Sequence, residues 1–200
     1  MKRGWVLALL LAGCLLLGGC GEAEFDIETV RETYTQALTM TAEADITTHS
    51  GVLADYTVSF TRQDGVSTVT LLAPESLAGI SARTYEGRAE IEYEDVAVET
   101  LLPSVSGFVP VDALSGVIDD LCGSVPADYC AEELEGISCI ALTFETSTAE
   151  YAGQKRVWLD SQSLAVLRAE FYLDGQMVMT MSVRDFAFAG QAPDAQGQNS

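Results

Sequence analysis

The sequence predicts an α+β domain built on an antiparallel sheet, and three observations carry this prediction. Apolar and polar residues alternate with period two from residue 40 to about 99 and from 151 to 186, which is typical of half-buried strands. Two segments outside these blocks have apolar residues at helical spacing. Three dipeptides predict the hairpin turns: Asp64-Gly65, Glu86-Gly87 and Asp174-Gly175.

The first nineteen residues have the pattern of a signal peptide. Two basic residues precede an apolar run at positions 5–17, which is shorter than a typical membrane-spanning helix. The run ends in Leu-Gly-Gly before Cys20, the pattern cut by lipoprotein signal peptidase. A second match ends at Cys14, but cleavage there would leave three leucines in the mature chain. We therefore predict a signal peptide at 1–19 and lipidation of Cys20.

Cleavage at this site leaves 181 residues, enough for one domain with its own core. The mature chain has 8 basic and 30 acidic residues and a net charge of −22, against −20 for the whole chain. Such a charge excludes general attraction to nucleic acid or anionic headgroups. A diacylglycerol on Cys20 would hold the domain at the membrane, and the tether at 21–25 reaches at most about 17 Å.

The first helix is predicted over residues 26–38, with Asp26 as its N-cap. Glu28 lies in the first turn, where the helix dipole favours a negative charge. The apolar stripe of this helix is interpreted as core: Ile27, Val30, Tyr34, Ala37 and Leu38.

In the first block of strands, the turn dipeptides predict the register of each hairpin. A two-residue turn at Asp64-Gly65 places apolar residues opposite each other: Phe60 with Val69 and Val58 with Leu71, while Thr61 faces Thr68 on the other side. The turn at Glu86-Gly87 pairs Ala82 with Ile91 and Ile80 with Tyr93. Three glutamates then share the opposite face, which we interpret as a solvated strand face and not a calcium site: Glu90, Glu92 and Glu94.

A loop is predicted over 103–110, followed by a short apolar helix from Ala113 to Leu121 that Asp112 caps and Gly123 ends. Gly116 weakens the helix prediction by about 1 kcal/mol. Placed between two blocks of strands, this segment either lies across a curved sheet as a lid or simply covers the core. The domain is predicted over 26–190, and residues 191–200 are predicted to be a disordered tail.

The second block is predicted to form three strands with one broad apolar face. A three-residue loop, Leu173-Asp174-Gly175, would place Phe171 opposite Met177, Ala169 opposite Met179 and Leu167 opposite Met181. That face is either core or an apolar binding surface.

The cysteines and the single histidine favour no metal site. Cys122, Cys130 and Cys139 match no zinc spacing. Cys130 and Cys139 flank a predicted turn, so an extracytoplasmic disulfide between them is one expectation; pairing of Cys122, or three buried thiols, are the alternatives. His49 is interpreted as a turn residue. The sequence has no nucleophile elbow, phosphate loop, dinucleotide fingerprint or zinc-protease motif, so we expect no catalysis and no cofactor.

The order of these features resembles the LolA/LolB-like family. The resemblance covers most of the mature chain and rests on the signal pattern ending at Cys20, the helix, the hairpins and four motifs: Leu72-Ala73-Pro74-Glu75, Ala78-Gly79-Ile80, Val157-Trp158-Leu159-Asp160 and Leu167-Arg168-Ala169-Glu170. It implies an unclosed antiparallel half-barrel with helices on the concave side and acyl chains as cargo. The LolA carrier is soluble, whereas this chain is predicted to be lipidated, like LolB or the lipid-binding lipoproteins of mycobacteria.

Two functional hypotheses follow. The first is a membrane-anchored lipoprotein that binds lipid or the acyl chains of lipoproteins in an apolar cavity, because each buried CH₂ contributes about 0.8 kcal/mol. The second is an envelope interaction protein with a filled half-barrel, as in GerS, a germination lipoprotein that partners a cortex amidase. Cavity volume distinguishes them. Periodicity suggests these ligand-contacting residues: Val58, Phe60, Val69, Leu71, Val157, Leu159, Leu167, Phe171, Met177, Met179 and Met181.

Overall fold

The structure, a computed structural model, describes residues 26–51, 53–85, 88–93, 96–100, 107–148 and 150–191. The predicted signal peptide, Cys20 and the tether lie outside these residues, as do the Glu86-Gly87 turn and Glu94. Among the residues described, no helix is both long enough and apolar enough to cross a membrane.

One antiparallel sheet of eleven strands organises the described chain. Its first half, in chain order, is β1 (Ala37–Thr48), β2 (Ala54–Gln63), β3 (Val66–Ala73), β4 (Ser81–Tyr85), β5 (Arg88–Tyr93) and β6 (Val96–Thr100). Its second half is β7 (Asp128–Leu134), β8 (Ile137–Ser147), β9 (Ala152–Asp160), β10 (Val166–Leu173) and β11 (Gln176–Gln191). The spatial order is β6-β5-β4-β3-β2-β1-β11-β10-β9-β8-β7, so the first and last strands of the chain pair at the centre.

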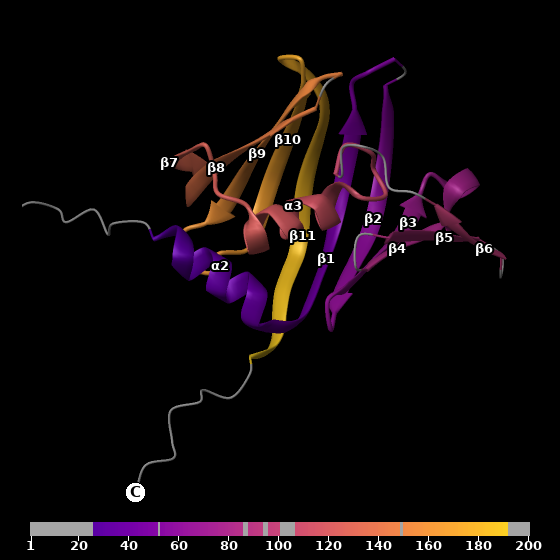
Figure 1. Cartoon of the computed structure of the whole chain (residues 1–200), viewed down its shortest axis with the longest axis horizontal. Coiled ribbons are helices and arrows are strands. Elements are labelled where there is room, and N and C mark those ends of the chain that lie inside the picture. Colours follow the sequence, from indigo (N-terminus) through magenta and orange to yellow (C-terminus); the bar gives the residue numbers. More distant parts are fainter. Residues whose placement is uncertain are drawn as a thin grey trace, which may run out of the picture.

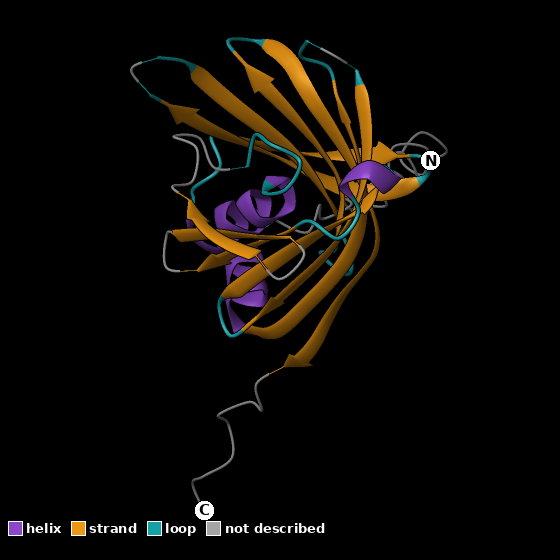
Figure 2. Cartoon of the chain, turned by 90° about the vertical axis from the view of Figure 1, so that its right-hand side faces the viewer, coloured by secondary structure: helices purple, strands orange, loops and turns teal. Residues whose placement is uncertain are grey.

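The sheet curves around two α-helices, α2 (Ile27–Gln36) and α3 (Ala113–Gly123), while the short helix η2 (Glu75–Leu77) follows β3. Figures 1 and 2 show both α-helices on the concave side. In the described residues the two edge strands, β6 and β7, do not pair with each other. The predicted fold class, an unclosed antiparallel half-barrel with helices on its concave side, is confirmed.

Helix α2 begins as predicted and ends earlier. Asp26 accepts a hydrogen bond from the Glu28 amide at 3.0 Å, so it is the expected N-cap. The helix ends at Gln36, because Ala37 adopts extended backbone and pairs with Gln191 in β1. The prediction that the helix includes Ala37 and Leu38 is therefore wrong. Pairing along the centre of the sheet outweighs the helical spacing of these two residues, and Leu38 is 50 % exposed.

Tyr34 shows how α2 is seated on the sheet. Its ring is buried against Phe186 and Phe188 of β11, and its hydroxyl donates to the Leu164 carbonyl oxygen at 2.6 Å. Burial raises the pKa of Tyr34 well above its ordinary value, so the hydroxyl stays a donor. The stripe of α2 through Val30 and Tyr34 is core, as predicted.

The β2–β3 hairpin has the predicted register. Asp64 and Gly65 both have positive φ, and the partners across the ladder are those expected from a two-residue turn: Phe60 with Val69, Val58 with Leu71 and Thr61 with Thr68. Between β4 and β5, Ala82 lies opposite Ile91, also as predicted. Ile80 precedes β4, so its predicted pairing with Tyr93 falls outside the ladder.

The β10–β11 hairpin differs from the prediction. Asp174 and Gly175 both have positive φ and form a two-residue turn, with Leu173 opposite Gln176. The register then shifts between Tyr172 and Phe171. As a result, Phe171 lies opposite Met179 and Ala169 lies opposite Met181. The predicted three-residue loop is wrong because a tight turn and a bulge together take up the extra residue. The pairing moves by two positions, which leaves the apolar face intact.

The C-terminal boundary also differs by one residue. Gln191, predicted to begin a disordered tail, is the last residue of β11 and pairs with Ala37. Residues 192–200 lie outside the described part of the chain.

Candidate functional site

The concave face of the half-barrel is the predicted ligand surface, and it forms the main core of the protein. Nine of the eleven suggested ligand-contacting residues are buried in one apolar cluster: Val58, Phe60, Val69, Leu71, Val157, Leu159, Phe171, Met179 and Met181. The period-two pattern therefore identified inward-facing residues. Their burial shows packing against protein atoms, and a ligand could reach them only if protein atoms moved away.

Two of the suggested residues do not belong to this face. Leu167 packs on the convex side against a small cluster of Cys139, Ala141 and Trp158. The β9–β10 register shifts between Val166 and Arg168, and this irregularity turns Leu167 to the opposite side. Met177 follows the turn, pairs with Tyr172 before the register shift, and is 39 % exposed. Neither side chain is positioned to contact a ligand on the concave face.

Helix α3 fills the concave side. Its apolar residues Leu114, Val117, Ile118 and Leu121 are buried in the same cluster as the inward-facing strand residues. Ser115 and Gly116 are buried as well, so α3 is covered on more than the face that meets the sheet. A helix buried on several sides is part of a core, whereas an amphipathic lid would expose one polar side. The predicted helix is confirmed, and its role as core cover fits better than its role as a lid.

Gly116, which weakens the helix prediction, is explained by close backbone packing. A Cβ on Gly116 would lie 2.6 Å from the Cα of Gly107, in the turn that precedes α3. Gly107 has a φ of +88°, a left-handed conformation that favours glycine. The two glycines let the turn lie directly against the helix. This close contact offsets the helix propensity that is lost at Gly116.

Lys155 is a buried cation beneath α3 that the sequence analysis missed. It lies on the concave face of β9 and is 4 % exposed. Its Nζ donates to Asp120 Oδ2 at 2.8 Å and to the Gly116 carbonyl oxygen at 3.3 Å, and it lies 5.6 Å from the centre of the Phe108 ring. The alternation along β9 could have indicated that Lys155 faces the core, because it has the same parity as Val157 and Leu159.

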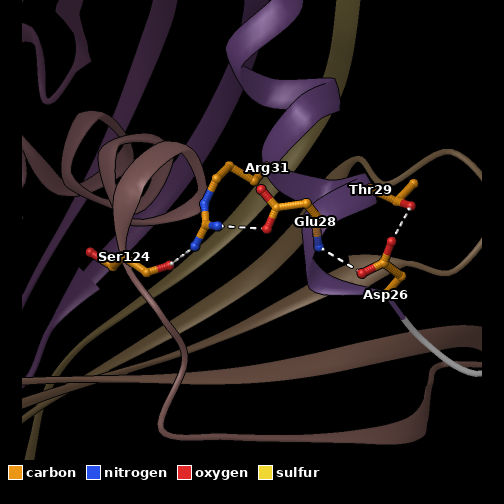
Figure 3. A network of polar contacts seen from close by, with 5 residues as sticks. All are labelled: Asp26, Glu28, Thr29, Arg31 and Ser124. Carbon is orange, nitrogen blue, oxygen red and sulfur yellow. Dashed lines mark hydrogen bonds and ion pairs between the residues drawn. The ribbon is translucent and has the colours of Figure 1, made fainter.

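Two further cations hold the same end of α3. Arg62 of β2 pairs with Asp119 at 2.6 Å. Arg31 of α2 donates to the Ser124 carbonyl oxygen at 3.3 Å, just after α3, and pairs with Glu28 at 2.7 Å (Figure 3). Asp119 and Asp120 lie near the C-terminus of α3, where the helix dipole disfavours negative charge. Their ion pairs with β2 and β9 offset that cost and fasten α3 to both halves of the sheet.

Asp112 precedes α3 as predicted but does not cap it with its side chain. Its Oδ1 accepts a hydrogen bond from the Val109 amide at 3.1 Å, whereas Oδ2 and the Ser115 hydroxyl are buried without a protein partner in the described structure. Burial raises the pKa of Asp112, and hydrogen bonds from nearby backbone amides and the charge of Lys155 oppose this effect. The polar side chains at the start of α3 therefore have fewer hydrogen-bond partners than those at its end.

A groove lies at one end of the half-barrel, between the start of α2 and strands β7 and β8. Its volume is about 1050 Å³. Its lining is Asp26, Thr29, Val30, Tyr129, Cys130, Ala131, Glu132, Glu133, Ser138, Cys139, Ile140, Ser161 and Leu164. None of the suggested ligand-contacting residues is in this set, and three carboxylates make the groove different from a purely apolar acyl cavity.

The cysteines do not form the expected disulfide. Cys130 lies opposite Ala141 and Cys139 lies opposite Glu132, so the two are offset from each other on β7 and β8. Cys122, Cys130 and Cys139 are free thiols. Over the described ranges, no three side chains of His, Cys, Asp or Glu gather as a metal site, and His49 Nε2 lies 3.2 Å from the Thr180 hydroxyl.

Comparisons with known proteins support the fold and go no further. The sequence matches no protein-family model and no curated protein. An uncharacterized conserved protein from Thermus thermophilus is structurally similar over 87% of this chain and 91% of that chain, with a TM-score of 0.52 and 14% identity. At this identity, the similarity establishes the fold alone.

Two further solved structures are similar to this chain with lower scores. One is the LolA superfamily protein NE2245 from Nitrosomonas europaea, which is 14% identical, with 85% of this chain and 96% of that chain covered and a TM-score of 0.42. The other is a chain from the structure of the CwlD amidase from Clostridioides difficile in complex with the GerS lipoprotein, with 13% identity, 80% of this chain and 92% of that chain covered, and a TM-score of 0.42. The protein is an open antiparallel half-barrel.

Proposed function

We propose that the protein is an extracytoplasmic lipoprotein, anchored through Cys20, that works by binding another protein of the cell envelope. The observation that carries this proposal is the filled concave face. The residues that would line an acyl cavity are buried together with α3 in a single core. When the half-barrel is filled, only its outer surfaces remain to bind another protein. Binding of this kind requires no catalytic group.

The fastening of α3 supports the same proposal. Three cations from three different elements contact α3 or its C-terminal end, and Lys155 is buried in doing so. Admission of an acyl chain under α3 would break the Lys155–Asp120 pair and leave two charges in an apolar setting, which costs about 3–5 kcal/mol. The burial of an acyl chain would have to offset that cost as well as replace the contacts of α3.

The test is to purify the mature chain under native conditions and analyse it by mass spectrometry for lipid bound non-covalently, as distinct from the anchor on Cys20. We expect a folded domain that holds no lipid besides its anchor and does not bind fluorescent fatty-acid probes. In the native host, a photo-crosslinking residue at exposed Leu72 or Tyr129 should give a discrete protein adduct from at least one position. The same residue at buried Leu159 should give none. A stoichiometric acyl lipid bound non-covalently, or adducts with lipid alone, would overturn the proposal.

Acyl-chain binding is the second candidate, and one observation favours it. The apolar concave face continues past α3 onto β5 and β6, because Ile91 lies in the row that runs from Phe60 through Val69 and Ala82. On these outer strands the larger apolar side chains are exposed, namely Ile91, Tyr93, Val96 and Val98, whereas Ala89 is buried. A lipid bound there should be lost on Val98→Glu, which alters an exposed position, and retained on Val125→Glu, an equally apolar exposed position outside the sheet.

A further inference from the structure

Strand β7 is an edge with few of the usual safeguards against pairing. It lies at the end of the strand order and pairs along its seven residues with β8 in a continuous register. Exposed edges are usually guarded by bulges, prolines or lysines, which discourage another strand. The strand itself contains none of these: its sequence is Asp-Tyr-Cys-Ala-Glu-Glu-Leu. Its safeguards are carboxylates, which repel acidic segments and attract basic ones.

The groove lies beside this edge. Tyr129 and Ala131 face the concave side, because they lie opposite the core residues Leu142 and Ile140. Glu133 has the same parity and is exposed. A strand added to β7 would project alternate side chains into the groove, whose apolar lining includes Ile140 and Leu164. The groove volume of about 1050 Å³ is at the upper end of ordinary ligand pockets, so several side chains fit.

The charge of the groove specifies the occupant further. Among the described residues, its lining contains Asp26, Glu132 and Glu133 and no lysine or arginine. Asp26 caps α2, and Glu132 pairs with Arg156 and accepts from the Trp158 indole at 2.7 Å, so these two are engaged within the protein. Glu133, exposed on the groove side of β7, is the carboxylate placed to meet an incoming cation.

We propose that β7 and this groove receive an extended segment of the partner protein, which adds to the sheet as a further strand. Its groove-facing side chains are apolar beside Ala131 and Ile140, and a lysine or arginine lies opposite Glu133. Main-chain hydrogen bonds supply affinity and the alternate side chains supply specificity, as in other cases of strand addition. This inference rests on the proposed function and names the surface and the chemistry of the partner.

The experiment uses the mature chain and a seven-residue probe, Thr-Val-Thr-Val-Thr-Lys-Thr, with its reversed sequence to allow either strand direction. Binding is measured by fluorescence anisotropy and located by amide hydrogen exchange. We expect new protection at 128–134 and weaker binding by the matched probe with Glu in place of Lys. Glu133→Lys should weaken binding of the lysine probe by about ten-fold and favour the glutamate probe.

Glu145→Lys is the matched control, because it reverses an exposed charge on β8 at a position that does not line the groove. It should change the affinity by less than about two-fold, which is the size of a general field effect. Equal effects of Glu133→Lys and Glu145→Lys, or no protection at 128–134, would overturn the inference. Self-association through β7, seen by sedimentation and abolished by Ala131→Lys, would overturn it in favour of a second copy. A lipid-free chain that crosslinks to a protein but fails these tests would keep the proposed function and lose this surface.

Discussion

Lys155 and Arg156 are neighbours on β9 with opposite environments. Lys155 points to the concave side, where it is buried against Asp120 and the backbone of α3. Arg156 points to the convex side, where its guanidinium lies 4.9 Å from the Trp158 ring centre, pairs with Glu132 and stays partly exposed. The strand pleat alone separates them. One ion pair holds the core closed, and the other lies on a surface whose charges water already stabilises.

The largest expected effect is at Lys155. Lys155→Ala leaves Asp120 without its main partner and opens space beside Phe108, so we expect a loss of about 3–5 kcal/mol in the free energy of unfolding. Urea denaturation followed by tryptophan fluorescence measures it. The double variant Lys155→Met/Asp120→Leu should recover most of the loss, because an apolar pair removes both charges. A loss below about 1 kcal/mol for Lys155→Ala would mean that α3 is not held by this pair.

Gly116→Ala comes next and tests the closeness of α3 to its preceding turn. The new Cβ would lie 2.6 Å from the Cα of Gly107, so backbone must move, and we expect a net loss of about 1–2 kcal/mol despite the gain in helix propensity. Gly123→Ala, at the end of the same helix, is the control, because no heavy atom of the described residues lies within 4 Å of its added Cβ. It should be neutral or stabilise by up to about 1 kcal/mol. Similar values for the two variants would contradict the packing account.

Asp112→Asn should change how stability depends on pH. Burial raises the pKa of Asp112, so the folded state keeps the proton at pH values where the unfolded state has lost it. Its contribution to stability is therefore largest at low pH and falls as the pH rises from the ordinary aspartate value through the raised one. The difference in urea midpoint between wild type and Asp112→Asn, followed from acid to neutral pH, should show this fall. A constant difference would contradict it.

The smallest effect is expected at Arg156. Arg156→Ala removes a stacked, partly exposed cation and its pair with Glu132, and exposed pairs of this kind contribute at most about 1 kcal/mol. Thermal unfolding of Arg156→Ala beside Lys155→Ala gives the direct comparison between the two sides of β9. An equal loss for both variants would show that the convex cluster around Trp158 is as important to stability as the core.

Local pattern predicted most of the scaffold correctly. Two-residue turn chemistry at Asp64-Gly65 predicted the β2–β3 register, and nine of the eleven residues suggested by period-two alternation face inward. The errors in strand register fall where one extra residue had to be placed. The β10–β11 bulge and the register shift beside Leu167 both insert a residue into a ladder. A period-two pattern cannot locate such an insertion, because strand residues on either side keep their alternation.

The candidate site was harder to predict than the scaffold. Lys155 has the parity of a core residue in the sequence. Its partner Asp120, however, lies 35 residues away on α3, and no sequence pattern identifies a carboxylate at that distance as the partner. The groove depends in the same way on α2 meeting β7 and β8 in space. Edge strands cannot be identified from the sequence either, because a strand is an edge only through the order of strands in the sheet.

Local turns and short-range periodicity in the sequence were enough to predict an antiparallel sheet, its two helices, its hairpins and the side of most strands that faces inward. The half-barrel shape was an expectation from the resemblance to the LolA/LolB-like family. Three features emerged only from the folded arrangement: α3 fills the concave side, Lys155 and Arg62 fasten it, and β7 is left as an acidic edge beside a groove. Those features depend on contacts between residues far apart in the chain. Their free energy comes from burial and charge pairing in three dimensions, which no local pattern encodes.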